Sequence, residues 1–267
     1  MDALSAACTA LLGSAPRSIE ALHGGDLSEV SRVVLQDGRT LVAKAGPLVA
    51  REGRMLAAIR AAGAPVPELF GEQAGILLME ALDAAPETPR SWPQFGEDLA
   101  RLHTHRGTQS GWAEDYAFGT VPIANAPLDD WPRFWAERRL LPFLPHLPTA
   151  LAPRLERLST RLAERLPDTA TSLLHGDLWR GNTLAGRGGR IHLIDPASYY
   201  GDGEVDLAML HLFGGPGPGF TEGYGPLAPG WQARRAVYSL FPALVHLRLF
   251  GEGYRGMVER FLTNAGA

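Results

Sequence analysis

The chain has 267 residues, of which 45% are hydrophobic and 20% are charged, so it is long enough for one large domain or two lobes. Its net charge of −4 and its pI of about 6.1 give no basic surface for nucleic acid. No apolar run reaches the roughly 18 residues that a membrane span needs, and the first residues lack the basic start of a signal peptide. The only cysteine, Cys8, excludes an intrachain disulfide and a cysteine-based zinc site. We therefore expect a cytoplasmic protein without nucleic-acid or membrane partners.

Residues 1–82 predict a small β-rich lobe. Small apolar residues over 3–15 favour an amphipathic first helix. Segments 30–35 and 40–45 have the composition of strands, and the Asp37-Gly38 pair between them is a strong hairpin signal. A helix is predicted over 49–62.

Two glycines, Gly24 and Gly25, lie just before the first of these strands. Their backbone N–H groups are candidates for contacts with phosphates. The segment matches neither common phosphate-loop motif, so an ordinary Gly-Gly turn remains an alternative.

The return strand carries the only lysine among 25 basic residues, Lys44. Residues 40–44 (TLVAK) are similar to the V-A-I-K strand of kinases, whose lysine contacts ATP phosphates. Glu52 lies on the apolar stripe of the following helix, where a carboxylate needs a partner, and Lys44 is the natural one. The alternatives are that Lys44 protects a sheet edge and that Glu52 is solvated.

A continuous apolar strand over 76–79 is followed by a proline-rich segment, which we interpret as a linker over 83–93 between two lobes. The strand ends at Met79, a position also compatible with plain core filling. Beyond the linker, residues 94–267 predict a mainly helical lobe. Helices are expected at 95–103, 129–146, 151–166, 203–213, 231–250 and 253–264, with Pro242 kinking or interrupting the fifth.

The most informative run reads His175-Gly176-Asp177-Leu178-Trp179-Arg180-Gly181-Asn182, with Asp195 thirteen residues later at the end of a short strand. An Asp followed by an Asn five positions on is the spacing of the kinase catalytic loop. Phosphoryl transfer needs a carboxylate that accepts a hydroxyl proton and two oxygen ligands for Mg²⁺. Asp177, Asn182 and Asp195 provide these in kinase order, although Asp-Gly-Asn clusters are also common in turns. The whole order predicts an α+β, protein-kinase-like bilobal fold.

The chain resembles the fructosamine/ketosamine-3-kinase family, which is related to aminoglycoside and choline phosphotransferases. The segments that carry the resemblance are 174–182 (LHGDLWRGN), 194–201 (IDPASYYG), 204–209 (EVDLAM) and 212–215 (LFGG), with further matches over 111–140 and 224–251. The Pro196-Ala197 pair after Asp195 separates this family from its relatives, in which an aromatic residue usually follows that Asp.

The resemblance implies ATP-dependent phosphorylation of the 3-hydroxyl of a ketosamine, the sugar adduct that glycation leaves on an amine. The 3-phosphate is unstable and frees the amine, which amounts to deglycation repair. The resemblance gives each candidate residue a role. At the reacting groups, it implies that Asp177 accepts the hydroxyl proton, that Asn182 and Asp195 bind Mg²⁺, and that Asp206 braces the catalytic loop. For ATP, it implies that Lys44 contacts the α- and β-phosphates and that Glu52 orients Lys44. The adenine-binding hinge would be formed by the residues after Met79, namely Glu80, Ala81 and Leu82.

Substrate contacts are less defined. Trp179 is a candidate platform for the apolar face of the sugar or a core support of the loop, and Trp231 and Tyr200 are weaker candidates of the same kind. Arg180 stands where the family most often has Ser, and it could contact the γ-phosphate, an acidic substrate or only solvent. Tyr116 replaces the Asn of the family pattern, which puts a substrate or lobe contact there in doubt.

Other functions fit parts of the sequence. Another small-molecule kinase of the same fold, acting on an aminoglycoside, a choline-like compound or a sugar, is the nearest alternative. A nucleotide-binding pseudokinase would not need the complete residue set. A metal-dependent hydrolase that uses Asp177, Asp195 and His175 leaves Lys44 and the linker unexplained. The sequence does not define the oligomeric state, nor whether the ketosamine is free or protein-bound.

Overall fold

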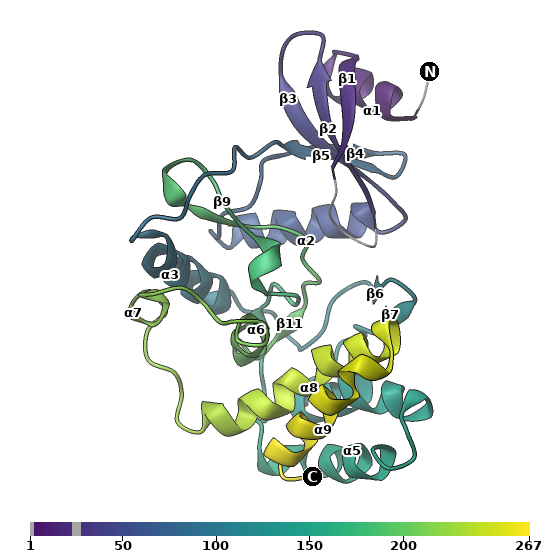
Figure 1. The fold of residues 1–267 in the computed structure, drawn as a ribbon, viewed down its shortest axis with the longest axis vertical. Helices are drawn as coiled ribbons and strands as arrows, with labels where there is room; N and C mark the ends of the chain where they lie inside the picture. Colours follow the sequence, from purple (N-terminus) through teal and green to yellow (C-terminus); the bar gives the residue numbers. More distant parts are fainter. Residues whose placement is uncertain (1–2, 23–27) are drawn as a thin grey trace.

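The computed structural model describes residues 3–22 and 28–267 and shows a β-rich lobe above a mainly helical one (Figure 1). The upper lobe consists of α1 (Ala3–Leu12), α2 (Val49–Ala61) and the strands β1 (Pro16–Leu22), β2 (Glu29–Leu35), β3 (Thr40–Ala45), β4 (Leu69–Gln73) and β5 (Ile76–Glu80). The strands form one antiparallel sheet in the order β1-β2-β3-β5-β4. The predicted bilobal α+β fold is confirmed. Gly24 and Gly25 lie outside the described residues.

The predicted hairpin between β2 and β3 is present, and Gly38 provides the positive φ of +90° that its turn requires. Two strands, β1 and β4, were not predicted. Every residue of β1 is exposed or half-buried, so the strand lacks the alternation of apolar and polar residues that reveals a half-buried strand. Helices cover the sheet: α1 buries Ala7 and Cys8 against it, and α2 buries Leu56 and Ile59.

The linker between the lobes is shorter than predicted. The helix α3 (Ser91–Thr104) begins at Ser91, so the last three residues of the predicted 83–93 linker form its first turn. Pro93 is compatible with this turn because the first N–H groups of a helix have no partner within the helix. Pro93, which the sequence prediction took as the last residue of the linker, therefore lies in the first turn of α3.

The helical lobe differs from the sequence prediction in its details. The predicted helix over 129–146 is α4 (Trp131–Trp135) continued by a π turn (Ala136–Leu140) and a 3₁₀ segment (Leu141–His146). The predicted helix over 151–166 is α5 (Ala152–Ser159) and a short 3₁₀ turn (Leu162–Glu164). Pro142 and Pro145 lack the N–H groups that a continuing α-helix needs, which accounts for the 3₁₀ segment.

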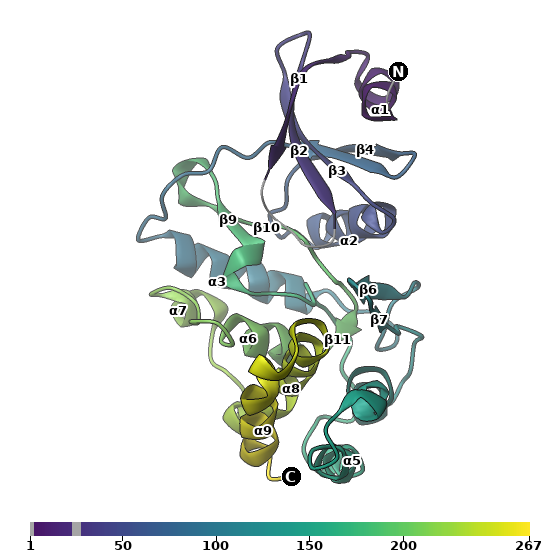
Figure 2. The same cartoon turned by 45° about the vertical axis from the view of Figure 1, so that its right-hand side comes forward.

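Two further helices build the base of this lobe, where α8 (Trp231–Phe250) packs against α9 (Arg255–Asn264) (Figure 2). Pro242 was predicted to kink or interrupt this helix; α8 runs through it without interruption, and the kink stays a prediction. Earlier in the chain, α6 (Glu204–Leu210) is shorter than the predicted 203–213. The short helix α7 (Phe220–Tyr224) and the hairpin of β6 (Tyr116–Phe118) and β7 (Val121–Ile123) were not predicted. None of the helices in the described part of the chain is long and apolar enough to cross a membrane.

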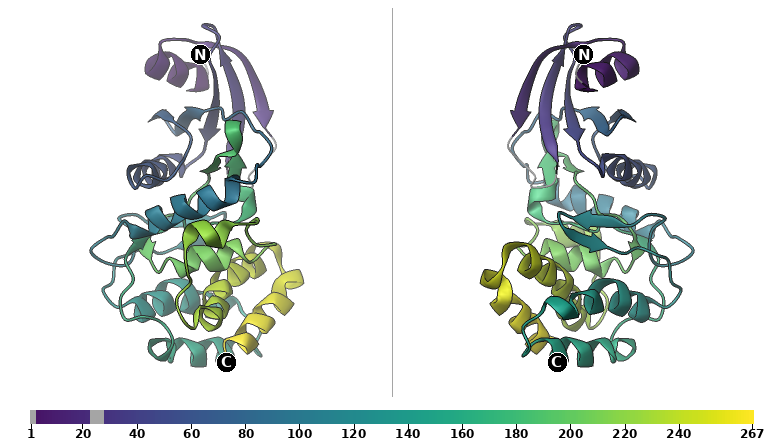
Figure 3. Two further views of the ribbon diagram at one scale, coloured as in Figure 1. Left: turned by 90° about the vertical axis from the view of Figure 1, so that its left-hand side faces the viewer. Right: turned by 90° about the vertical axis from the view of Figure 1, so that its right-hand side faces the viewer.

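A small hairpin lies where the lobes meet, between β9 (Thr183–Ala185) and β10 (Ile191–Leu193) (Figure 3). Its turn contains a short 3₁₀ segment (Arg187–Gly189). The N–H of Leu193 donates to the carbonyl of Pro65, which follows α2, at 2.8 Å. This hairpin therefore joins the upper lobe to the segment that carries the catalytic motif.

Helix packing gives a direct test of the fold. A Cβ at Gly96 in α3 would lie 2.3 Å from the carbonyl oxygen of Phe220 in α7, whereas a Cβ at Gly256 in α9 meets open space. Gly96→Ala should lower the unfolding free energy by about 1–3 kcal/mol through overpacking. The matched change Gly256→Ala should be neutral or stabilise by up to about 1 kcal/mol, because Ala favours the helix. Denaturant titration of both variants checks the packing, and equal effects would contradict it.

Candidate active site

The catalytic motif forms a loop between β8 (Ser172–Leu173) and β9. The side-chain amide of Asn182 donates both to the backbone carbonyl of Asp177, at 2.8 Å, and to its carboxylate, at 2.9 Å. The five-residue spacing thus folds the Asn back onto the Asp. The amide N–H groups orient the Asp177 carboxylate, and the side-chain oxygen (Oδ1) of Asn182 is left for another partner.

Asp206, at the start of α6, holds the beginning of this loop. Its carboxylate accepts the N–H of His175 at 2.7 Å and the N–H of Gly176 at 2.9 Å, and it lies 3.1 Å from His103 Nε2. The bracing position predicted for Asp206 is present. Gly176 has a φ of +84°, and a Cβ there would lie 2.1 Å from the carbonyl oxygen of Ala197, so only glycine fits.

His175 links the loop to the strand that ends at Asp195. The N–H of Asp177 donates to His175 Nδ1, so the ring proton sits on Nε2, which donates to the carbonyl of Ile194 at 2.9 Å. Burial lowers the pKa of His175, which keeps the ring neutral in this role. The contacts of His175 are thus those of a support for the loop.

Lys44 joins the upper lobe to the catalytic segment. Its ammonium lies 2.8 Å from the carboxylate of Glu52 on α2 and 2.7 Å from that of Asp195. Burial opposes the charge of Lys44, but the two carboxylates outweigh it and raise its pKa. Glu52 is only 2% exposed, so its carboxylate depends on this partner. The alternatives of an edge-strand lysine and a solvated Glu52 are therefore excluded.

Asp195 has an unusual backbone. Its φ of +55° lies in the left-handed region, which residues other than glycine rarely adopt. Such strain persists only where the surrounding structure enforces it, and it is frequent at functional sites. The register of β9 and β10 pairs Thr183 with Leu193, so Asn182 and Asp195 lie at the same end of the hairpin.

The two oxygen donors fit a hard cation. One carboxylate oxygen of Asp195 and the side-chain oxygen (Oδ1) of Asn182 have no hydrogen-bond partner among the described residues. Mg²⁺ in kinases takes one or two such protein ligands, with phosphates and water completing its shell. No group of three or more His, Cys, Asp or Glu side chains suited to a metal occurs in 3–22 and 28–267, which agrees with this sparse ligand set.

The protonation of Asp177 suits proton transfer. Burial raises its pKa to about 7, with the hydrogen bond from Asn182 opposing the rise and the charge of Asp195 adding to it. A general base works best when its pKa lies close to the operating pH. Asp177 can therefore accept a proton near neutrality without being permanently protonated.

The hinge candidates follow β5. Met79 is buried in the sheet, and Glu80 ends the strand with its N–H bonded to the carbonyl of Glu68 at 2.8 Å. Ala81 and Leu82 continue as half-buried, irregular backbone. Their role in binding adenine stays a prediction.

The three predicted substrate residues are in different surroundings. Trp179 is 39% exposed beside Asp177, as a platform requires. Arg180 binds Glu87 of the linker at 2.8 Å and lies over the ring of Trp92, so it is not free in solvent. A contact between Arg180 and a substrate stays a prediction. Trp231 packs on His211, and no ring contact between it and the catalytic loop is found among the described residues.

Sequence reasoning missed several contributors. His103 supports Asp206 and in turn contacts the hydroxyl of Tyr224 at 2.9 Å, and its only sequence signal was a position in a predicted helix. Tyr116 lies near the site: burial and the charges of Glu52 and Asp195 raise the pKa of its hydroxyl.

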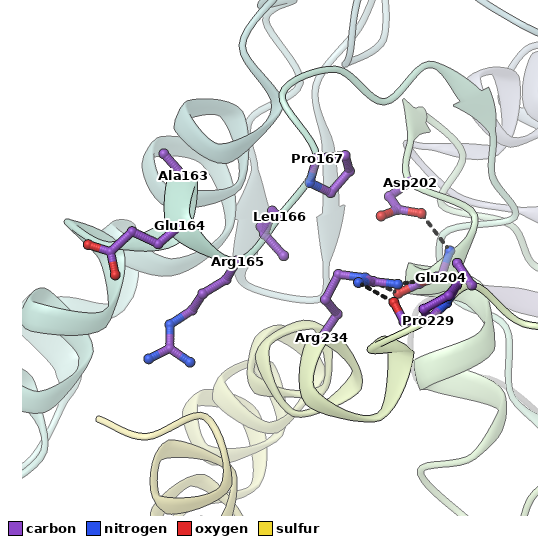
Figure 4. A pocket seen from close by; sticks show the side chains of 10 residues that line it. Ala163, Glu164, Arg165, Leu166, Pro167, Asp202, Glu204, Pro229 and Arg234 are labelled. Atoms are coloured by element: carbon purple, nitrogen blue, oxygen red, sulfur yellow. Dashed lines mark hydrogen bonds and ion pairs between the residues drawn. The ribbon is translucent and has the colours of Figure 1, made fainter.

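A separate hollow of about 470 Å³ lies beside Asp202 and Arg234 (Figure 4). Glu204 satisfies Arg234 there, and the hollow includes none of the predicted residues.

Known proteins can now be compared with this geometry. The model of the family described as fructosamine kinase matches residues 3–266. The chain belongs to the fructosamine kinase family. A Thermus thermophilus protein named probable ketoamine kinase is 37% identical over 254 residues, 91% of this chain and 92% of that one. The crystal structure of a Thermobifida fusca protein provisionally named fructosamine-3-kinase has a TM-score of 0.90 at 33% identity over 99% of both chains.

More distant structures share the fold alone. A spectinomycin phosphotransferase, solved with ADP and spectinomycin, has a TM-score of 0.59 at 14% identity over 98% of this chain and 92% of its own. Membership of the fructosamine kinase family and the kinase-like fold, both predicted from the sequence, are thus confirmed.

The contacts of Arg180 predict how its replacement by the usual serine of the family affects activity and stability. Its pair with Glu87 is half exposed, so Arg180→Ser should cost less than about 1 kcal/mol of stability and change kcat/KM only a few-fold. Arg187→Ser, which breaks the exposed pair with Asp83, is the control. Steady-state kinetics and thermal denaturation measure both. A hundredfold loss of activity confined to Arg180→Ser would show that the guanidinium contacts a reacting group.

Proposed function

We propose that this protein phosphorylates the 3-hydroxyl of ketosamines, with ATP as donor, and thereby initiates deglycation. The observation that carries the proposal is the contact between Lys44 and Asp195, because it joins the predicted phosphate-binding lysine to the predicted catalytic segment. The regiochemistry and the substrate class follow from membership of the fructosamine kinase family. A reducing cytoplasm is the proposed location.

The proposed reaction is a single displacement. The hydroxyl oxygen attacks the γ-phosphorus, the bond from that phosphorus to the bridging oxygen of ADP breaks, and the hydroxyl proton passes to the Asp177 carboxylate. Asn182 keeps the carboxylate oriented, and Lys44, held by Glu52, binds the α- and β-phosphates. Asn182 and Asp195 would hold Mg²⁺, which neutralises phosphate charge when bound. The backbone of Glu80, Ala81 and Leu82 is the proposed adenine-binding hinge.

A substrate screen tests the proposal. ADP release should accompany turnover of fructose-, ribulose- or erythrulose-derived amines, while the corresponding free sugars serve as controls. Loss of the 3-hydroxyl from the substrate should abolish turnover. Inactivity on every ketosamine together with turnover of an unrelated alcohol would contradict the proposed substrate class, and would favour another small-molecule kinase.

Asp177→Asn should lower kcat by about 10²–10⁴-fold, because the amide cannot accept the hydroxyl proton. Binding of Mg-ATP should change little, as a ligand-induced thermal shift would record. Asp168→Asn, at an exposed carboxylate of the helical lobe, is the matched control and should retain full activity. A loss of ATP affinity without a loss of kcat would contradict the role of Asp177.

Lys44→Met should lower kcat/KM for ATP by at least about a hundredfold, because the phosphates lose their ammonium partner. It should also destabilise the protein by about 3–5 kcal/mol, since Glu52 becomes a buried charge without a partner. Adding Glu52→Gln should restore much of the stability and none of the activity. Recovery of activity together with the melting temperature would show that Lys44 acts only on stability.

A further inference from the structure

Exposed apolar side chains cluster at the catalytic loop. Five large ones are exposed in the part of the chain that the structure describes: Ile19, Leu22, Trp179, Phe213 and Phe250. The first two belong to β1, but the other three come from the catalytic loop, the segment after α6 and the end of α8. Large exposed apolar groups that gather from separate elements commonly mark a binding surface.

The last three belong to one continuous row of rings. The centroid of Trp179 lies 6.1 Å from that of Phe213, in an edge-to-face contact, and Phe213 lies 5.2 Å from His246. His246 continues the row to Phe250 at 5.5 Å and to Tyr254 at 5.0 Å. We call these five residues the aromatic strip. Two of the five, His246 and Phe250, lie on α8, which runs from the base of the helical lobe toward the junction of the lobes (Figure 2).

His246 gives the middle of the strip a hydrogen-bond acceptor. His246 Nδ1 lies 2.8 Å from the carbonyl of Pro242, which can only accept, so Nδ1 carries the proton. Burial lowers the pKa of His246, so the ring is neutral at pH 7. Its Nε2 then presents a lone pair, and no partner for it is found in 3–22 and 28–267.

A ketosamine offers the complementary chemistry. Its secondary amine is protonated near neutral pH, and ring faces attract substituted ammonium groups, while a neutral imidazole nitrogen accepts an N–H bond. The amine is on C1 and the reacting hydroxyl on C3 of the same sugar. A hydroxyl at Asp177 therefore brings the amine close to Trp179, two residues further along the loop.

We propose that the aromatic strip binds the protonated amine of the ketosamine together with an apolar group attached to that amine. This inference rests on the proposed function and specifies its substrate class, namely ketosamines of apolar or aromatic amines. Trp179 receives the ammonium with His246, and Phe213, Phe250 and Tyr254 receive the attached group. The strip carries no charged side chain that would favour an acidic or a basic carrier.

The experiment compares two fructosamines, one derived from benzylamine and one from methylamine. The unmodified protein should use the benzylamine adduct with a kcat/KM about tenfold higher, chiefly through KM, as one added aromatic contact allows. Phe250→Ala should reduce this ratio toward one, and Phe250→Tyr, which keeps a ring, should retain it. Ile19→Ala removes a similarly exposed side chain from β1, 46% against 54%, and should leave both rates unchanged.

The outcomes separate the two proposals. Phosphorylation of both adducts at equal kcat/KM, or a ratio that survives Phe250→Ala, would overturn the role of the strip and leave the kinase function intact. Failure to phosphorylate either adduct, with Mg-ATP binding still detected by thermal shift, would overturn the ketosamine function itself. Phe250 is on the surface, so its variants are expected to fold, and their melting temperatures confirm this.

Discussion

The contacts of one buried ammonium determine how the two lobes meet. Lys44 lies in the sheet of the upper lobe, and it holds Glu52 of α2 on one side and Asp195 of the catalytic segment on the other. Each carboxylate makes the burial of the lysine tolerable, and the lysine does the same for Glu52. The position of α2 on the sheet and the position of the sheet over the β9–β10 hairpin therefore depend on the same three charges. Loss of Lys44 would leave Glu52 as a buried charge without its partner.

A second set of contacts, made by Asp206 of α6, holds the start of the catalytic loop in place. The fully buried carboxylate of Asp206 accepts two loop N–H groups, and burial alone would raise its pKa, but these bonds and His103 lower it. His175 then connects the same loop to Ile194, next to Asp195. The proposed proton acceptor, Asp177, and the proposed metal ligands are thus held by one connected set of hydrogen bonds. Such an arrangement suits phosphoryl transfer, in which positioning and charge stabilisation provide most of the catalysis.

The sequence predicted those parts whose chemistry has few alternatives. A single lysine and a carboxylate on an apolar helix stripe were enough to pair Lys44 with Glu52, and the Asp-Asn-Asp order was enough to group Asp177 with Asn182 and Asp195. The contact between Lys44 and Asp195 came from the structure. The sequence prediction failed where the structure depends on tertiary context. The exposed strand β1 has no periodic pattern to detect, and the prolines of the linker and of 141–146 have several compatible conformations. The partner of Arg180 is 93 residues away in the chain, so only the fold could reveal it.

The charge of Arg180 has a consequence for the proposed substrate. An arginine in place of the usual serine adds a positive charge one residue from Trp179, where the protonated amine of a ketosamine is proposed to bind. An unpaired guanidinium there would repel the amine. Glu87 instead neutralises it at 2.8 Å, and the ring of Trp92 covers it, with the indole N–H of that ring bound to the same carboxylate. The guanidinium of Arg180 is thus paired with the linker. Because this pair has no net charge, it does not repel a cationic substrate at the aromatic strip.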